Sequence, residues 1–309
     1  MVKYVFGHQN PDTDAVVSAM VYAEFLNNQG IQSKAVKLGD MNKETKFVLE
    51  QAEAEEPETV ESLPEGSEVI LMDHNEKKQT ISNIDELEIN AIIDHHKFNL
   101  QTSSPVNIRA EKIGSSCSVL YKMFSEQGYE LSRKEAILLI SGVISDTLYF
   151  RSPTTTEQDR QIVRTLQPLT GIENPEEYSL KMFDAKSDIG DMSPKELVKL
   201  DYKVFDFKKG KYGVGVIETT DSKKSMEKKE EIIKAIVEIK KEEKLDGIFL
   251  SIIDILNGQN KTIVSDEDDA EIIEKAFSNA KKLEENIYSL GDIVSRKKQI
   301  IPELEVTLS

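Results

Sequence analysis

The chain has 309 residues and carries 39 lysines and arginines against 56 aspartates and glutamates, which gives a formal net charge of −17. An acidic surface repels nucleic acid and anionic membranes, so neither is expected as a partner, although a small basic pocket for a compact anion is still allowed. The most apolar stretch, residues 136–145, is far shorter than the roughly 20 residues that a membrane-spanning helix needs.

Length and cysteine content set two further limits. Domains commonly contain about 100–200 residues, so this length predicts two of them. Cys117 is the single cysteine, which leaves no partner for an intramolecular disulfide and fits a reducing compartment. The N-terminus becomes polar within its first seven residues, too early for a signal peptide. We therefore expect a two-domain cytoplasmic protein.

Apolar runs and helical patterns alternate in the first third of the chain. A helix is expected over residues 15–28, with Gly30 placed to end it. The apolar runs are continuous rather than alternating, which is typical of strands covered on both faces in a parallel sheet. The sequence therefore predicts an N-terminal α/β domain with a mainly parallel sheet flanked by helices. Its strands are expected at residues 2–6, 35–38, 68–72 and 90–93.

Helices follow in the middle of the chain. One is expected over residues 116–127. Ser132 to Glu135 form a capping-box pattern that begins an apolar helix running toward Asp146, and Thr154 to Glu157 form another that begins a helix through Leu166. The pattern indicates helices packed on the predicted sheet.

A second, smaller α/β domain is expected after a polar, glycine-containing linker at residues 186–192. Directly after the linker, Ser193 to Glu196 combine a helix cap, a proline and a capping glutamate. Residues 221–244 predict an amphipathic helix with a charged outer face. Strands are expected at residues 204–207, 212–217 and 247–253. The expected domains are residues 1–188 and 189–309.

All four histidines lie in three short polar segments, residues 7–14, 73–75 and 94–96, each directly after an expected strand. The carboxyl ends of parallel strands share one rim of a sheet, so these segments are expected to converge. Asp146 follows another apolar run and is placed to add a carboxylate. The candidate metal ligands are His8, Asp12, Asp14, Asp73, His95 and Asp146, with His74, Asp94 and His96 beside them.

So many carboxylates repel one another unless cations neutralise them, and a pair of divalent ions does so economically. Two ions that share a carboxylate suit hydrolysis at phosphorus. Imidazole among the oxygen ligands favours Mn²⁺ or Co²⁺ over Mg²⁺ or Ca²⁺. A single Asp-His segment is more often a turn or a helix cap, but three segments that hold every histidine favour a metal site.

A basic cluster, Ser295-Arg296-Lys297-Lys298-Gln299, lies near the C-terminus. Charge runs are more often solvated surface, but apolar neighbours on both sides argue against a floppy segment here. Arginine and lysine suit phosphate oxygens, which makes this cluster a candidate anion site, with Lys203 as a weaker candidate. Cys117 and the preceding Gly114 to Ser116 are interpreted as a helix start, although their backbone N–H groups also suit phosphate.

The motifs at residues 7–14, 73–75, 94–96 and 295–299 together closely resemble the family II (manganese-dependent) inorganic pyrophosphatases of the DHH phosphoesterase superfamily. The resemblance spans almost the whole chain. The Asp-His-His signature alone indicates only the superfamily, and the first and last motifs narrow it to the pyrophosphatases. An active site in the cleft between the two domains is implied.

The resemblance also implies a role for each candidate residue. His96 is the implied substrate-side histidine, able to assist the leaving group. The implied phosphate-binding residues of the second domain are Lys203, Arg296 and Lys297. One metal ion is implied at His8, Asp12 and Asp73, and the other at Asp14, Asp73, His95 and Asp146, with Asp73 bridging.

The implied reaction is hydrolysis of pyrophosphate to two orthophosphates by a hydroxide held between two Mn²⁺ or Co²⁺ ions per subunit. Mg²⁺ is expected to accompany the substrate, and the protein is expected to be a cytoplasmic homodimer. One alternative is a DHH phosphodiesterase acting on short oligonucleotides or cyclic dinucleotides. The lack of any histidine after His96 counts against this alternative. Another is a non-catalytic sensor of metal or phosphate.

Overall fold

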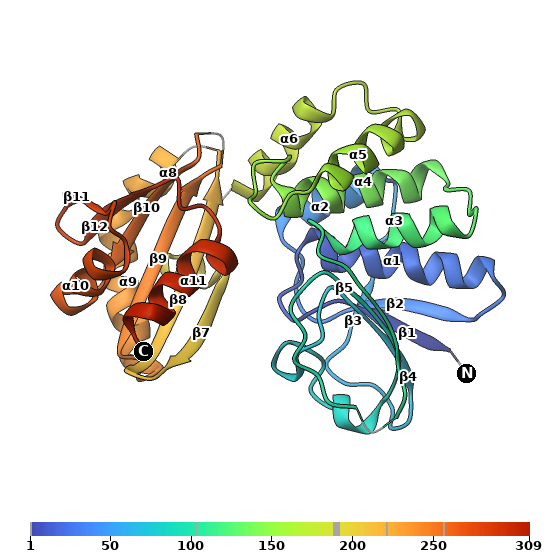
Figure 1. The fold of residues 1–309 in the computed structure, drawn as a ribbon, viewed down its shortest axis with the longest axis horizontal. Coiled ribbons are helices and arrows are strands. Elements are labelled where there is room, and N and C mark those ends of the chain that lie inside the picture. The colour runs from blue at the N-terminus through green and yellow to red at the C-terminus, as the bar shows by residue number, and fades with distance from the viewer. Residues whose placement is uncertain (1, 103, 188–191, 221, 256) are drawn as a thin grey trace. The chain divides into compact units, whose positions relative to one another are not determined.

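Two six-stranded sheets, one in each half of the chain, organise the protein (Figure 1). The computed structural model describes residues 2–102, 104–187, 192–220, 222–255 and 257–309. These residues form two units, Met1–Ala185 and Lys186–Ser309. The expected domain boundary between residues 188 and 189 lies outside the described residues.

The sheet of the first unit is parallel throughout, as its continuous apolar strands predict. Its strand order is β3-β2-β1-β4-β5-β6. The order reverses between β1 and β4, and in open α/β sheets ligands bind at such a switch point, beyond the carboxyl ends of the strands. The strands are β1 (Lys3–Phe6), β2 (Ser33–Lys37), β3 (Glu58–Thr59), β4 (Glu68–Met72), β5 (Glu88–Asp94) and β6 (Asn107–Ala110).

Helices cover one face of this sheet. In Figure 1, α1, α3, α4 and α5 lie on the same side of the strands, and α4 packs against α1, α3 and α5. Because α4 has neighbours on several sides, its residues from Glu135 to Ser145 are all buried, which explains its long apolar run. The helices are α1 (Thr13–Asn28), α2 (Lys43–Gln51), α3 (Ser116–Glu126), α4 (Arg133–Thr147), α5 (Glu157–Thr170) and α6 (Pro175–Ser187).

The other face of the sheet is covered by the connection between β4 and β5. This connection contains two short 3₁₀ turns, η1 (Lys77–Gln79) and η2 (Ile84–Glu86). Ile81 and Ile84 pack with Leu71 and Ile92 of the sheet in one apolar cluster. The central strands β1, β4 and β5 are therefore covered on both sides, as the sequence predicted, whereas the edge strands β3 and β6 are largely exposed.

Two helix starts differ from the expected ones. α1 begins at Thr13 because the side chain of Asp12 accepts a hydrogen bond from the backbone N–H of Ala15 at 3.0 Å. The capping box before α5 is formed by Thr156 and Asp159, two residues later than predicted, and the helix continues past Leu166. The capping box predicted at Ser132 is confirmed.

The second unit has a mixed sheet in the order β11-β12-β10-β9-β8-β7, in which β8 and β9 are parallel and the other pairs antiparallel. Its strands are β7 (Tyr202–Phe207), β8 (Gly210–Thr219), β9 (Gly247–Asp254), β10 (Gln259–Val264), β11 (Lys281–Glu284) and β12 (Ile287–Gly291). Its helices are α7 (Pro194–Lys199), α8 (Ser222–Glu227), α9 (Lys229–Glu242), α10 (Glu267–Ala276) and α11 (Ile301–Thr307), with a π-helical turn η3 (Arg296–Ile300) before α11.

Apolar clusters lie on both faces of this second sheet. α7 and α9 pack with Ile248 and Leu250 of β9 on one face, and α10 and α11 pack with Phe249 on the other. The single amphipathic helix expected over residues 221–244 is instead two helices, α8 and α9, separated at Lys228, while Asp221 lies outside the described residues. Within the described parts of the chain, no helix is long and apolar enough to span a membrane.

Candidate metal centre

The carboxyl ends of β1, β4 and β5 bring the predicted acidic and histidine side chains together. His8 follows β1, and Asp73 directly follows β4. His95 and His96 follow β5. A further carboxylate, Asp146, comes from the last turn of α4. The sheet therefore gathers residues that lie far apart in the sequence at its switch point.

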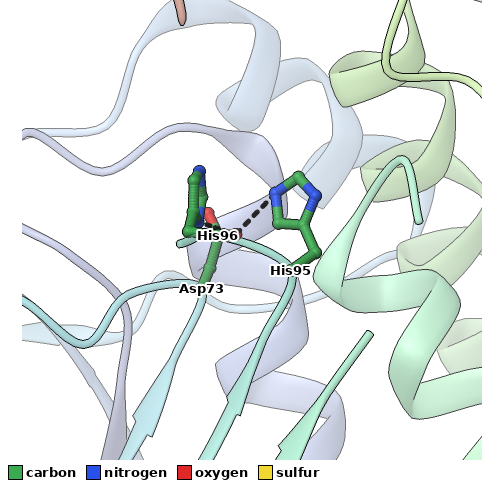
Figure 2. A group of neighbouring side chains, drawn as sticks. All are labelled: Asp73, His95 and His96. Atoms are coloured by element: carbon green, nitrogen blue, oxygen red, sulfur yellow. Dashed lines mark ion pairs between the residues drawn. The ribbon is translucent and has the colours of Figure 1, made fainter. Parts of the chain in front are cut away.

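Asp73 is at the centre of this arrangement. Its backbone has a φ of 58°, a left-handed conformation that Asp and Asn tolerate better than most residues. Its Oδ2 lies 3.5 Å from Nε2 of His8, and its Oδ1 lies 3.3 Å from Nε2 of His95. Figure 2 shows the His95 and His96 rings around this carboxylate. The two oxygens of Asp73 therefore face two different sets of side chains.

Among the described residues, three groups of acidic and histidine side chains have ligand atoms within 4.8 Å of one another. Two of them coincide with the two ion sites that the resemblance implies, and both contain Asp73. The third includes His96, which the sequence placed on the substrate side. The groups are His8, Asp12 and Asp73; Asp14, Asp73, His95 and Asp146; and Asp73, His95 and His96. That these residues bind metal stays a prediction.

The electrostatics of the cluster fit divalent cations. Oδ2 of Asp73 and Nε2 of His95 are buried without a hydrogen-bond partner among the described residues, which is costly unless a ligand satisfies them. Burial and the nearby carboxylates of Asp73 and Asp146 raise the pKa of Asp14 well above its usual value. A cation relieves this repulsion, and a mixed carboxylate and imidazole set suits Mn²⁺ or Co²⁺.

The histidine rings are oriented by hydrogen bonds at Nδ1. Nδ1 of His8 lies 2.8 Å from the carbonyl oxygen of Gln9, and Nδ1 of His95 lies 3.0 Å from that of Ile113. A protonated Nδ1 in each ring leaves Nε2 facing the carboxylates, which is the usual arrangement of a metal-binding histidine. The side chains of both residues are thus oriented by the backbone before any ligand binds.

Asp94 and His74 lie outside these ligand sets as orienting or packing groups. Oδ1 of Asp94 accepts hydrogen bonds from the backbone N–H groups of His95 and His96 and lies 2.8 Å from Nδ1 of His96. Asp94 therefore shapes the turn that presents both rings. Burial lowers the pKa of His74 to about 4, and its Nδ1 lies 2.8 Å from the carbonyl oxygen of Met72.

The start of α3 contacts the cluster in a way that sequence reasoning missed. The Ser115 hydroxyl and the backbone N–H groups of Ser116 and Cys117 all donate to the Asp14 carboxylate, at 2.7 to 3.0 Å. The Ser116 hydroxyl donates to Oδ1 of Asp73 at 2.9 Å. The segment interpreted from the sequence as a helix start thus orients two candidate ligands. The sequence signal that could have indicated this role is a helix N-terminus, whose free N–H groups attract carboxylates.

We expect the metal-free protein to lose thermal stability as the pH rises from 6.5 toward 10. Burial disfavours the charge of His8, but Asp12 and Asp73 outweigh it and raise the pKa of His8 to about 10. A raised pKa in the folded state contributes stability that is complete below pH 6.5 and is lost as the pH rises through about 10. Melting temperatures in chelator across this range test the prediction. His8→Gln should flatten the slope, and an unchanged slope would contradict it.

Gly142 has no side chain, and this allows α4 to approach the start of α3 closely. A Cβ atom there would overlap Sγ of Cys117 and lie 2.8 Å from Oδ1 of Asp14. Gly142→Ala should therefore destabilise the protein by about 1–3 kcal/mol, because overpacking outweighs the better helix propensity of alanine. Urea unfolding measures the loss. Adding Cys117→Ala should recover part of it, whereas a stable single variant would show that the helices separate freely.

The basic cluster of the second unit forms the turn η3. Oε1 of Gln299 accepts hydrogen bonds from the backbone N–H groups of Val294 and Ser295 at 3.0 and 2.9 Å, which fixes the turn. The two terminal nitrogens of Arg296 donate to the carbonyl and carboxylate oxygens of Asp201, both at 2.7 Å. The guanidinium is therefore held in one orientation.

Lys203 belongs to the same neighbourhood. It lies in β7, two residues after Asp201. Desolvation disfavours the Asp201 carboxylate, but the charges of Arg296 and Lys203 lower its pKa below the ordinary value. Lys297 is exposed on the turn. The structure thus brings Arg296 and Lys203 together around one carboxylate, and their binding of phosphate stays a prediction.

Comparison with known proteins agrees with this geometry. Residues 3–143 match the N-terminal domain of the DHH family, and residues 180–307 match the DHHA2 domain. A probable manganese-dependent inorganic pyrophosphatase from Deinococcus radiodurans is 42% identical over 306 residues, with 97% of each chain covered. The manganese-dependent inorganic pyrophosphatase of Methanocaldococcus jannaschii is 40% identical over 313 residues, with 98% of each chain covered.

A solved structure agrees with these matches. The crystal structure of a putative family II inorganic pyrophosphatase from Methanococcus jannaschii is 39% identical and superimposes with a TM-score of 0.86 over 99% of each chain. The resemblance inferred from the sequence motifs is thereby confirmed. With matches at this identity along nearly its whole length, the chain belongs to the family II, manganese-dependent inorganic pyrophosphatases.

Proposed function

We propose that this chain hydrolyses inorganic pyrophosphate to two orthophosphates at the carboxyl ends of β1, β4 and β5. The observation that carries the proposal is a cluster of carboxylates and imidazoles in which two buried atoms, Oδ2 of Asp73 and Nε2 of His95, lack a hydrogen-bond partner among the described residues. Such atoms are satisfied by cations, and the relatives of this chain are manganese-dependent pyrophosphatases.

Two divalent ions, Mn²⁺ or Co²⁺, are proposed at the two groups that share Asp73. When bound, they would acidify a water for attack on phosphorus and neutralise the phosphoryl oxygens, and Mg²⁺ would accompany the substrate. The carboxylates and rings of the chain serve to fix these charges in place. The proposed ligands are His8, Asp12 and Asp73 for one ion, and Asp14, Asp73, His95 and Asp146 for the other.

His96 is proposed to move a proton to the leaving phosphate. The carboxylate of Asp94 accepts from Nδ1 of His96 at 2.8 Å, so we place the proton transfer at the second ring nitrogen, Nε2. In the reaction, the bond between the bridging oxygen and one phosphorus breaks while a water oxygen bonds to that phosphorus. A proton from Nε2 of His96 would neutralise the released oxygen.

Arg296, Lys203 and Lys297 are proposed to bind the phosphate oxygens of the substrate. A guanidinium has five N–H donors, and two of those on Arg296 are directed at Asp201, which keeps the fork oriented while others contact phosphate. Lysine adds compact positive charge beside it. The unit that contains these residues would thus act as the substrate-binding part of the protein, and residues 1–188 as the metal-binding part.

The decisive experiment is orthophosphate release from pyrophosphate by metal-stripped protein reloaded separately with Mn²⁺, Co²⁺ or Mg²⁺. We expect turnover with Mn²⁺ and Co²⁺ and much less with Mg²⁺ alone. A substrate panel with short oligonucleotides and cyclic dinucleotides distinguishes the phosphodiesterase alternative. Binding of metal and pyrophosphate without turnover would identify a sensor instead. We further propose that the protein is a cytoplasmic homodimer. Light scattering at several protein concentrations measures the number of subunits and tests the second part of this proposal.

A further inference from the structure

Glu44 is a buried carboxylate that lies outside every candidate ligand group. It belongs to the first turn of α2, which the Asn42 side chain caps. Its Oε2 accepts hydrogen bonds from the hydroxyl of Thr13 at 3.0 Å and from the hydroxyl of Ser145 at 2.8 Å. Both hydroxyl residues are themselves buried. One carboxylate therefore joins α1, α2 and α4 inside the first unit.

The two hydroxyl residues have a special place in the sequence. Thr13 directly precedes Asp14, and Ser145 directly precedes Asp146. Asp14 and Asp146 belong to the same candidate ligand group, yet they come from opposite ends of two different helices. Glu44 thus ties α1 and α4 together at the very turns that carry these two carboxylates.

Burial of this carboxylate is costly. Removing a carboxyl group from water carries a free-energy cost even after the protein relaxes, and an apolar side chain at the position avoids that cost. Hydrogen bonds from hydroxyls to a charged acceptor recover part of it and are strongly directional. A buried acidic side chain that accepts hydrogen bonds from two helices fits a need for exact spacing rather than for stability.

We propose that Glu44 is a positioning residue of the metal centre, which holds Asp14 and Asp146 at the separation needed to bind one divalent ion. The inference rests on the proposed metal-binding role of those two aspartates. α2 is itself fixed in place, because the hydroxyl of Thr45 lies 3.1 Å from that of Thr13 and accepts or donates there. The support for the ligands thus comes from a helix that contributes none.

The test is the Mn²⁺ affinity of metal-stripped Glu44→Gln, measured by competition with a chelator. Glutamine keeps the size of the side chain, but its amide oxygen is a weaker acceptor for the two hydroxyls than a carboxylate oxygen. Partners of this kind commonly contribute about 10- to 100-fold to metal affinity, so we expect a loss of at least about tenfold for the ion bound by Asp14 and Asp146. Ser145→Ala, which removes one of the two hydrogen bonds and leaves Glu44 itself in place, should lose part of the same affinity.

Glu135→Gln is the matched control. Glu135 is a buried carboxylate of α4 as well, but it closes the capping box at the opposite end of the helix, where it accepts from Ser132 and Tyr129. This variant should lower the melting temperature and leave Mn²⁺ affinity unchanged. If Glu44→Gln also lowers only the melting temperature, Glu44 is merely structural and the inference is wrong.

The design separates failure of this inference from failure of the proposed function. If the parent protein neither binds Mn²⁺ nor releases orthophosphate from pyrophosphate, the proposed function falls. If the parent does both and Glu44→Gln binds Mn²⁺ as tightly as the parent, only the positioning role of Glu44 is overturned.

Discussion

Asp73→Asn should lower the turnover of pyrophosphate by about a thousandfold or more, equivalent to about 4 kcal/mol of lost transition-state stabilisation. Asp73 belongs to all three groups of candidate ligands, and its two oxygens face His8 and His95 separately. Asparagine keeps the shape and tolerates the left-handed φ of 58°, so the backbone is preserved. It offers one neutral acceptor in place of two charged ones, which leaves at least one group without its shared ligand.

Orthophosphate release and the number of bound Mn²⁺ ions are the measurements for this variant. His8→Gln is the comparison, because His8 belongs to one group and should therefore cost less activity than the loss of Asp73. The rise in melting temperature that Mn²⁺ gives the parent protein should also shrink in Asp73→Asn. Turnover within about tenfold of the parent, with two ions still bound, would contradict the central place of Asp73.

Arg296→Ala should lower kcat/KM for pyrophosphate by about 10²–10³-fold while Mn²⁺ affinity stays that of the parent. Arg296 lies in the second unit and in none of the ligand groups found among the described residues. Its guanidinium is oriented by Asp201 and offers the planar fork that phosphate oxygens prefer. Removing the guanidinium should therefore weaken the binding of the negatively charged phosphate groups of the substrate and leave Mn²⁺ binding unchanged.

Two further variants, one at Arg296 and one at Asp201, test the role of the oriented guanidinium. Arg296→Lys keeps the positive charge but loses the fork, so its kcat/KM should lie between those of the parent and of Arg296→Ala. Asp201→Asn should raise the KM, because the arginine loses the carboxylate that orients it. Loss of bound Mn²⁺ in Arg296→Ala would refute the proposed division of roles between the two units.

The parallel sheet of the first unit could be predicted from the sequence because β4 and the second half of β5 contain short apolar runs of consecutive buried residues. β3 and β6 could not, since they lie at the edges of the sheet and are short and largely exposed. The break at Lys228 was missed for another reason. The charged sequence around it has no proline or glycine, so nothing local marks the end of one helix and the start of the next.

The candidate ligands could be predicted because histidine and aspartate after successive strands are unusual and chemically specific. Their supporting contacts could not, because Ser116 and Glu44 are common residues at common places in helices. Ser116 is important because α3 begins beside Asp73, and Glu44 because α2 contacts both α1 and α4. Such roles arise from tertiary packing alone, which a single sequence does not encode as a local pattern.

The candidate ligands come from positions between residues 8 and 146, after the ends of three strands, at the start of α1 and at the last turn of α4. Contacts between positions so distant in sequence are costly to form early in folding, so we expect this arrangement to assemble late. A cation that binds only the finished arrangement stabilises the native state without stabilising the folding transition state. Manganese should therefore prolong the lifetime of the folded unit rather than hasten its formation.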